Sequence, residues 1–344
     1  MSSFIERGWY GDDKRWWPLL ILLLPISAVL FFISTLRRAW LNRQVDQLVE
    51  PPVIVVGNIS LGGTGKTPLL AAMIQLLRLK GWSPGVVSRG YGGQSVQYPL
   101  LVSSEVPAEQ CGDEPKLLVD KTQVPLVVDP NRRRAVAHLL AHCHCDVVLS
   151  DDGLQHYALQ RDIEIAVLDG QRGVGNGFLF PAGPLREPFT RLAQVDFSVV
   201  NIAGPLHPSL APLEDKLVDM RMEPMAFVHV ATGERIPLQS MPSEQLWQVY
   251  CGIGNPQRFF MTLTAQGINF EPHIFPDHHS YSSADFTGHA DGFVLMTEKD
   301  AVKCRDFAGE HWYYLAVEAR LAADFIDQLD ALLLKVKARK VIAH

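Results

Sequence analysis

The chain has 344 residues, of which 47% are hydrophobic and 20% charged, with a formal net charge of −6 and a pI near 6. This composition is typical of a globular protein long enough for two domains, and it excludes a largely disordered or low-complexity chain. The acidic balance argues against a nucleic-acid-binding protein, whose footprint would be basic.

An apolar segment near the start of the chain, residues 16–36, contains no charged residue. It is long enough to cross the hydrocarbon core of a bilayer as a helix. Basic pairs flank it at 14–15 and 37–38, which favours an interfacial helix on the cytosolic face over a membrane-spanning one. Pro18 and Pro25 interrupt the segment, and a buried core helix is the third alternative.

The pattern beyond the apolar segment predicts a parallel sheet covered by helices. Short apolar runs predict strands at 53–57, 84–88, 124–128, 146–150, 163–168 and 196–200, with helices at 67–80 and 131–142. Continuous apolar strands that alternate with helices are typical of an α/β fold whose sheet is buried on both faces.

A glycine-rich loop joins the first predicted strand to the first predicted helix. It consists of Ser60, Leu61, Gly62, Gly63, Thr64, Gly65, Lys66 and Thr67. Its glycines let backbone N–H groups approach phosphate oxygens, while Lys66 reaches the β/γ-phosphates and the Thr67 hydroxyl ligates Mg²⁺. Ser60 stands where the usual pattern has glycine. The chain lacks a correctly spaced guanine-binding motif, so ATP is expected rather than GTP.

Two adjacent carboxylates, Asp151 and Asp152, follow the strand predicted at 146–150. In phosphate-loop proteins such a strand lies beside the first one, and its terminal Asp holds Mg²⁺ directly or through water. Side chains alternate along a strand, so the two carboxylates should differ in role, with Asp151 nearer the metal. A pair of Asp residues capping a turn is the alternative.

Two other groups of charged residues each have two possible interpretations, one functional and one structural. Asp113 and Glu114 precede a predicted helix, and a carboxylate there could take the proton of a phosphorylated hydroxyl or cap the helix. Arg132 opens a run of three arginines after the third predicted strand. One of the three could neutralise a transferring phosphoryl group, and the others are expected to be solvated.

A domain boundary is predicted between residues 203 and 245, where the periodicity weakens and prolines accumulate. A smaller α/β domain is expected beyond it, with strands near 247–251, 269–275, 292–296 and 312–317, and helices near 256–266, 298–306 and 321–338. In this domain His278 and His279 follow Asp277. They could orient a base across an interdomain cleft, or they could be ordinary surface histidines.

In this order, the motifs resemble those of the tetraacyldisaccharide 4′-kinases of lipid A biosynthesis. The resemblance runs through essentially the whole chain, from the hydrophobic N-terminus and the phosphate loop onward. Its other strings are residues 56–58, 88–93, 112–115, 151–156, 175–177, 181–188, 253–256, 275–279 and 297–301.

The resemblance implies ATP- and Mg²⁺-dependent phosphorylation of the 4′-hydroxyl of tetraacyldisaccharide 1-phosphate, giving lipid IVA. It implies that Asp113 is the catalytic base, that His278 is its partner, and that Lys66 and Arg132 act beside the phosphates. Thr67, Asp151 and Asp152 are then the metal-proximal residues. The implied substrate-binding residues are Asn58, Arg89, Tyr91, Glu114 and Arg186.

The expected fold class is α/β: a P-loop NTPase-type parallel sheet flanked by helices, with a smaller second α/β domain. The expected domains are a membrane-association segment (1–40), a nucleotide-binding kinase domain (41–215) and a C-terminal domain completing the active-site cleft (216–344). The expected partners are an acylated disaccharide lipid and the cytoplasmic face of the bacterial inner membrane. No nucleic acid is expected, and the chain is expected to be monomeric.

Two other functions compete with the lipid kinase. A membrane-tethered P-loop switch ATPase would phosphorylate nothing, and Leu61 counts against it because the membrane-associated partitioning ATPases carry a lysine there. The second domain, with its own polar motifs, also counts against a switch. A kinase for a soluble small molecule is disfavoured by the apolar segment.

Overall fold

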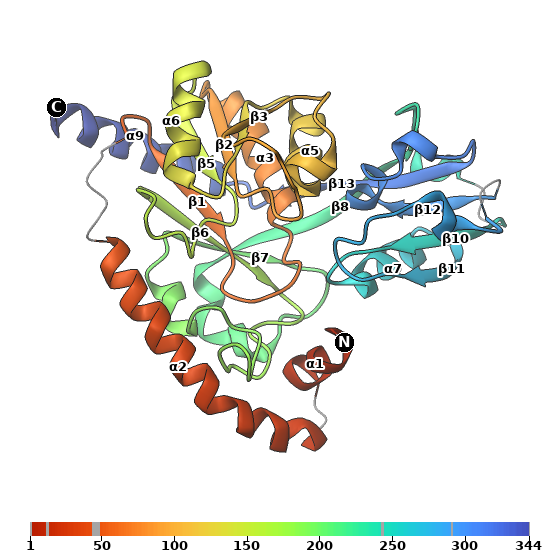
Figure 1. Ribbon diagram of the computed structural model, residues 1–344, viewed down its shortest axis with the longest axis horizontal. Coiled ribbons are helices and arrows are strands. Elements are labelled where there is room, and N and C mark those ends of the chain that lie inside the picture. The colour runs from red at the N-terminus through yellow and green to blue at the C-terminus, as the bar shows by residue number, and fades with distance from the viewer. Residues whose placement is uncertain (1, 12–13, 43–48, 242–243, 290–291, 344) are drawn as a thin grey trace.

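One mixed β-sheet runs through both lobes of the protein (Figure 1). The computed structural model describes residues 2–11, 14–42, 49–241, 244–289 and 292–343. In sheet order the strands are β11 (Asn269–Ile274), β10 (Leu246–Cys251), β12 (Val294–Thr297), β13 (Trp312–Leu321), β8 (Leu217–His229), β7 (Phe197–Asn201), β6 (Ile163–Asp169), β1 (Val53–Gly57), β5 (Val147–Ser150), β2 (Pro84–Ser88), β4 (Leu126–Val128) and β3 (Leu100–Val102); β9 (Arg235–Ile236) pairs with β8.

The first lobe contains the predicted parallel sheet. Its central strand β1 pairs in parallel with β5 on one side and β6 on the other. Every residue of β1 is buried: Ile54 and Val56 lie in one hydrophobic cluster, while Val53 and Val55 lie in another. The covering helices include α3 (Lys66–Leu79), α5 (Asp113–Thr122) and α6 (Arg132–His142). The predicted α/β fold is therefore confirmed, with both faces of the sheet covered.

The two lobes are joined by an antiparallel pair of strands, β8 and β13. β8 spans 13 residues and is the longest strand in the described part of the chain, yet it lies where the weak periodicity predicted only a boundary. Nine of its 13 residues are partly buried or exposed, so the period-two pattern is faint. Pro224 lies beside the irregularity at Ala316/Val317, where the register shifts. Proline is tolerated in a strand at such positions.

The second lobe is a smaller parallel sheet around an aromatic core. β10 pairs in parallel with β11 and β12, and α7 (Pro256–Ala265) covers the sheet. The helix expected over 298–306 is shorter than predicted, since α8 covers only Glu298–Ala301 and a 3₁₀ turn follows at Arg305–Phe307. Trp247, Phe286 and Trp312 are almost completely buried.

The last helix, α9 (Phe325–Ala343), returns to the first lobe, whereas the expected domain division assigned it to the second. Phe325, Leu329 and Leu333 lie in the same hydrophobic cluster as Ile54 of β1. Burying each such side chain stabilises the fold by about 1.5–3 kcal/mol. The division at residues 215 and 216 stays a prediction, but the packing of α9 follows the first lobe.

Two N-terminal helices lie along the outside of the first lobe (Figure 1). They are α1 (Ser2–Tyr10) and α2 (Trp17–Asn42). α2 continues through Pro25, and only 11% of its apolar window, taken within Trp17–Leu41, is buried. The core-helix alternative is therefore wrong. Large apolar side chains of α2, such as Leu22 and Phe32, are exposed.

Candidate active site

The glycine-rich loop follows β1 and ends at α3, as predicted. Gly62 and Gly65 have φ angles of 107° and 98°, in the left-handed region that favours glycine. The segment around Pro184 packs against the loop, and Pro184 O accepts a hydrogen bond from Leu61 N at 2.8 Å. Among the described residues, no protein acceptor is recorded for the N–H groups of Gly62 to Gly65. These groups can therefore converge on a phosphate.

Lys66 and Arg186 meet at Asp152, at the end of β5. Lys66 Nζ lies 3.6 Å from Asp152 Oδ1, and Arg186 Nη1 lies 3.0 Å from Asp152 Oδ2. Burial raises the pKa of Asp152, but the charges of Lys66 and Arg186 outweigh it and hold the pKa below its usual value. This carboxylate is thus ionised beside the lysine of the loop.

Asp151 occupies a different environment from its neighbour, but strand alternation is not the reason, because β5 ends at Ser150 and both carboxylates lie in the turn that follows, where Asp152 has a φ of 45°. Asp151 Oδ2 accepts a hydrogen bond from Ser88 Oγ at 3.1 Å, whereas its Oδ1 is buried without a hydrogen-bond partner. Burial, followed by the charges of Glu114 and Asp152, raises the pKa of Asp151 to about 7. A buried carboxylate oxygen without a donor is a site that a cation would stabilise.

The residues around the loop fit a Mg²⁺ ion shared with phosphates. Thr67 lies in the first turn of α3, and Asp151 offers its buried, unpaired oxygen. Mg²⁺ is usually held by one or two carboxylates together with substrate phosphates and water. Within the described residues no group of three or more His, Cys, Asp and Glu side chains could hold a metal by itself.

Arg132 is buried beneath the site and is not a solvated basic residue. Its guanidinium donates to the carbonyls of Asp129 at 3.0 Å and Asp151 at 3.2 Å, while its Nε has no partner. Burial lowers its pKa to about 10, although Asp151 and Asp152 act in the opposite direction. Arg132 therefore places positive charge behind the two carboxylates. Arg134 pairs with Asp129 instead.

The structure brings Asp113 and His278 together across the two lobes. His278 Nδ1 lies 3.2 Å from Asp113 Oδ2, although the residues are 165 positions apart in sequence. Lys303 Nζ also lies 3.2 Å from the same oxygen. Burial raises the pKa of Asp113, but the hydrogen bond from His278 and the charge of Lys303 outweigh it, and the pKa falls below its usual value.

The second nitrogen of His278 is held by Lys299, whose Nζ lies 3.2 Å from His278 Nε2. A neutral imidazole with its proton on Nδ1 satisfies both contacts, since Nδ1 donates to Asp113 and Nε2 accepts from Lys299; this tautomer is assigned from the network. His279 turns away and pairs with Asp285 at 3.5 Å. The geometry thus distinguishes the two adjacent histidines.

The remaining predicted residues surround this group. Asn58 is buried, and its Nδ2 donates to Gly62 O at 3.3 Å. Tyr91 is 66% exposed, and its ring meets the ring of His278 edge-on at 5.0 Å. Glu114 pairs with Lys299 at 3.4 Å, and Arg89 is exposed. Asn58, Tyr91 and Glu114 thus contact the loop or the His278 group, and the charge of Arg89 acts on Arg132.

Several residues that complete the site carry no motif of their own in the sequence. Lys299 and Lys303 orient His278 and Asp113, and their four-residue spacing around α8 was the available signal. Asn201 donates to Thr64 O at 3.2 Å, and Arg258 of the second lobe donates to Asn201 O at 3.4 Å. Asn201 ends a parallel strand, which is where ligand-proximal residues of such sheets gather.

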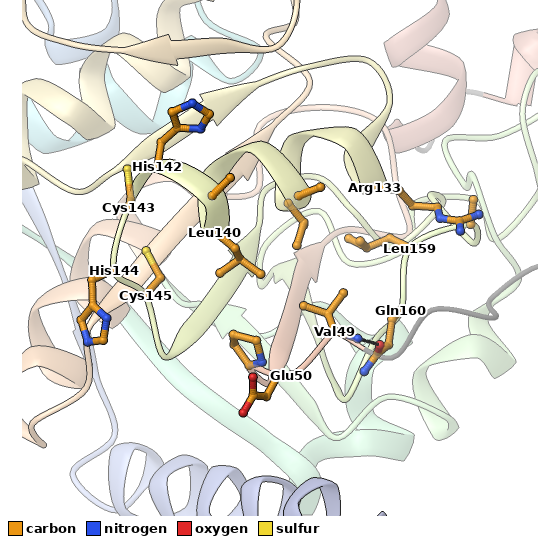
Figure 2. A pocket seen from close by; sticks show the side chains of 15 residues that line it. Val49, Glu50, Arg133, Leu140, His142, Cys143, His144, Cys145, Leu159 and Gln160 are labelled. Atoms are coloured by element: carbon orange, nitrogen blue, oxygen red, sulfur yellow. Dashed lines mark hydrogen bonds between the residues drawn. The ribbon is translucent and has the colours of Figure 1, made fainter. Parts of the chain in front are cut away.

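A separate cavity of about 810 Å³ lies between α6 and the segments at 49–51 and 158–160 (Figure 2). His142, Cys143 and His144 line it, as do several apolar side chains of α6. It contains none of the predicted site residues, and the chemistry lies elsewhere.

Fold and site together define a P-loop kinase: a phosphate-binding loop and strand-end carboxylates in one lobe, with a carboxylate–histidine pair closed by the other. The family model for Tetraacyldisaccharide-1-P 4′-kinase matches residues 19–334. The chain belongs to this family.

Relatives match over nearly their full lengths. The tetraacyldisaccharide 4′-kinase of Methylobacillus flagellatus is 43% identical over 99% of this chain and 98% of its own length. That of Pseudomonas aeruginosa is 45% identical over 98% of this chain and 100% of its own length. The apo form of LpxK from Aquifex aeolicus in complex with ATP superposes with a TM-score of 0.76 at 28% identity, covering 92% of this chain and 99% of that one.

Proposed function

We propose that this protein transfers the γ-phosphoryl group of ATP to the 4′-hydroxyl of tetraacyldisaccharide 1-phosphate, giving lipid IVA. The observation that carries the proposal is the contact between Asp113 and His278, 3.2 Å apart across the lobes. A switch ATPase needs no such pair, whereas a kinase needs a group that receives the proton of its acceptor. The names of the relatives identify the acceptor class.

Asp113 is the proposed base. Its lowered pKa keeps it ionised, which suits a transfer in which the hydroxyl loses its proton only as the new P–O bond forms. His278 and Lys303 fix the carboxylate, so its free lone pairs are aimed at one position. Tyr91 and Glu114 flank this position and are proposed to contact the sugar.

The triphosphate is proposed to lie on the loop from Ser60 to Thr67. Lys66 binds the β- and γ-phosphates. Arg132 lies behind Asp151 and stabilises the negative charge of the same phosphates. Mg²⁺ bound by Thr67, Asp151 and Asp152 would neutralise phosphate charge. Arg186, paired with Asp152, holds that carboxylate in place, and Asn58 steadies the loop through Gly62 O.

A cationic region between α2 and the site is proposed to receive the 1-phosphate and the polar part of the lipid. Burial, followed by the charges of Arg132, Arg161, Arg37 and Arg89, lowers the pKa of His156 to about 4. Arg161 Nη2 donates to His156 O at 2.7 Å, but Arg161 is paired with Glu164 at 2.8 Å, so Arg37 and Arg89 are the arginines proposed to meet the lipid phosphate. Arg37 lies on α2, so this region connects the apolar helix with the catalytic group.

α2 is proposed to lie in the plane of the membrane surface rather than to cross the bilayer. Ser27, near its middle, donates to Leu179 O at 2.9 Å and accepts from Ala182 N at 3.1 Å. A crossing helix would carry this loop to the bilayer centre, where irregular backbone exposed to lipid does not occur. Phe178 and Phe180, on the same loop, are exposed and would enter the interface beside α2.

The location that fits these features is the cytoplasmic face of the bacterial inner membrane, where ATP and an acylated substrate can meet. The proposed working unit is a monomer, because Asp113 and His278 come from one chain.

Transfer of label tests the proposal. The protein is incubated with γ-labelled ATP and tetraacyldisaccharide 1-phosphate in mixed micelles, and the lipid is then extracted. Label in the lipid phase is expected for the native protein and not for Lys66→Ala. Release of label only as free phosphate would instead support the switch ATPase.

A further inference from the structure

Arg172 lies beside the phosphate loop, on the turn that follows β6. A Cβ built on Gly62 would be 3.5 Å from Arg172 Nη1, and apart from the adjacent loop residues no other atom of the described chain lies within 4 Å of that position. The guanidinium thus lies against the loop at a residue whose φ is 107° and whose missing side chain leaves room for it.

Asp169 fixes the backbone of this turn, but it forms its ion pair with another residue. Asp169 Oδ1 accepts from the backbone N–H groups of Gln171 at 2.9 Å and Arg172 at 3.0 Å. The ion-pair partner of Asp169 is Arg258, at 3.1 Å. In the described part of the chain, no carboxylate oxygen is recorded within 4.0 Å of the Arg172 guanidinium. Arg172 is therefore held in place without being neutralised.

The side chain of Arg172 is held by the first helix of the chain. Its guanidinium carbon lies 5.0 Å from the centre of the Tyr10 ring, a cation–π contact. Tyr10 also donates from its hydroxyl to Leu61 O of the loop at 3.2 Å. α1 is anchored nearby, because Trp9 Nε1 donates to Pro181 O at 3.1 Å and Trp9 O accepts from Asn176 N at 2.8 Å.

The loop meets the second lobe at Gly62 and Gly63. A Cβ built on Gly254 of the second lobe would be 3.1 Å from Gly63 N and 3.3 Å from Asp277 Oδ2. Asp277 immediately precedes His278, the partner of Asp113. A cation at Gly62 is therefore next to the part of the loop that meets the lobe carrying His278.

We propose that Arg172 binds the terminal phosphate of ATP from the Gly62 side of the loop, and that Tyr10 positions Arg172 there. Lys66 and Arg186 share Asp152, and Arg132 donates to backbone carbonyls. Arg172 keeps its full charge for the ligand, and guanidinium matches phosphate in a planar, bidentate manner. The inference rests on ATP binding and not on the identity of the acceptor, so it can fail while the proposed function stands.

Nucleotide binding tests the role of Arg172. Arg172→Ala in the full chain is expected to weaken ATP at least about tenfold, as for a charge-assisted hydrogen bond, and to weaken ADP by less than about threefold. Arg172→Lys should recover part of the ATP affinity. Arg221→Ala, an exposed arginine on β8, is the matched control and should change neither affinity. An ATP affinity for Arg172→Ala within twofold of native would overturn the proposal, as would equal losses for ATP and ADP.

A double-mutant cycle tests the positioning role of Tyr10. Tyr10→Leu removes the ring and should weaken ATP in the native background but add little in the Arg172→Ala background. Tyr10→Phe keeps the ring and should lie closer to native. Equal losses from Tyr10→Leu in both backgrounds would mean that Tyr10 acts on the loop without Arg172, which contradicts the positioning role.

Discussion

The two ends of the site are built in different ways. The nucleotide end is built around consecutive residues of one lobe, from Ser60 to Thr67, whose backbone N–H groups are made accessible by glycine. The acceptor end consists of side chains from both lobes, with Asp113 on α5 and His278 and Lys303 in the second lobe. Backbone recognition is local and preformed, whereas the acceptor end exists only while the lobes are in contact.

Because the two ends are built differently, substitutions at one end and at the other should have different effects on ATP binding and turnover. A change at the nucleotide end should affect ATP binding and turnover together. A change at the acceptor end should affect turnover while ATP still binds.

The largest effect is expected at the nucleotide end. Lys66→Ala removes the positive charge that binds the β/γ-phosphates. Turnover should therefore fall about 10³-fold, and ATP should bind more weakly. Steady-state kinetics and equilibrium titration with ATP measure the two effects. Lys80→Ala, near the far end of the same helical segment, is the control and should leave both near native. A kinase rate for Lys66→Ala close to native would place the triphosphate elsewhere.

The next largest effect is expected at the acceptor end. Asp113→Asn keeps the shape of the side chain but removes the base, and kcat should fall about 10²-fold or more. ATP affinity should stay within about twofold of native, because no charge of the phosphate loop is changed. Glu109→Gln, an exposed carboxylate on the short helix just before α5, is the matched control. Equal losses of kcat and ATP affinity would mean that the two ends are one unit, contrary to the comparison.

A smaller effect is expected on the membrane side. Replacing both Leu22 and Phe32 of α2 by Asp should lower partitioning onto anionic vesicles by at least about tenfold, because two apolar side chains lose their burial in the interface. ATP affinity should not change. Leu79→Asp removes an apolar residue of α3 that is at least as exposed and should leave vesicle binding unchanged. Unchanged vesicle binding of the double variant would exclude α2 as the contact.

The smallest effect at neutral pH, but the most specific, is expected from Lys303→Met. Burial raises the pKa of Asp113, and His278 and Lys303 lower it below its usual value. Without Lys303 the pKa should rise. Since the active base is ionised, activity should then be lost at a higher pH as the solution is acidified. The acid limb of the kcat/KM profile measures this shift, with exposed Lys335→Met as the control. If the pKa of the acid limb is unchanged in Lys303→Met, Asp113 is not the base.

The same contrast explains what the sequence could predict. The loop and the strand before it are contiguous, and the burial of β1 on both faces follows directly from its apolar run. The link between β8 and β13 was missed because β8 is half-exposed and contains Pro224. Pairing of residues 165 positions apart depends on how the lobes pack, which no local pattern encodes. Family resemblance, rather than spacing, pointed to that pair.

α9 shows a related limit. Its apolar positions predicted a helix, but they are the same whether the helix covers the nearer lobe or the more distant one. Trp82 Nε1 donates to Asp330 of α9 at 2.7 Å, and Lys340 of α9 donates to Asp162 at 2.6 Å. These contacts to the first lobe join residues more than a hundred positions apart, so only the folded chain reveals them.

The central claim is that the γ-phosphoryl group reaches the 4′-hydroxyl of the disaccharide lipid. Two-dimensional ³¹P–¹H correlation of the purified lipid product tests it most directly, because it identifies the sugar proton next to each phosphate. The expected result is a new phosphomonoester coupled to H4′, together with the original phosphate at position 1, and no such signal with Asp113→Asn at matched time. A new phosphate at another position, or unchanged lipid alongside consumed ATP, would contradict the claim.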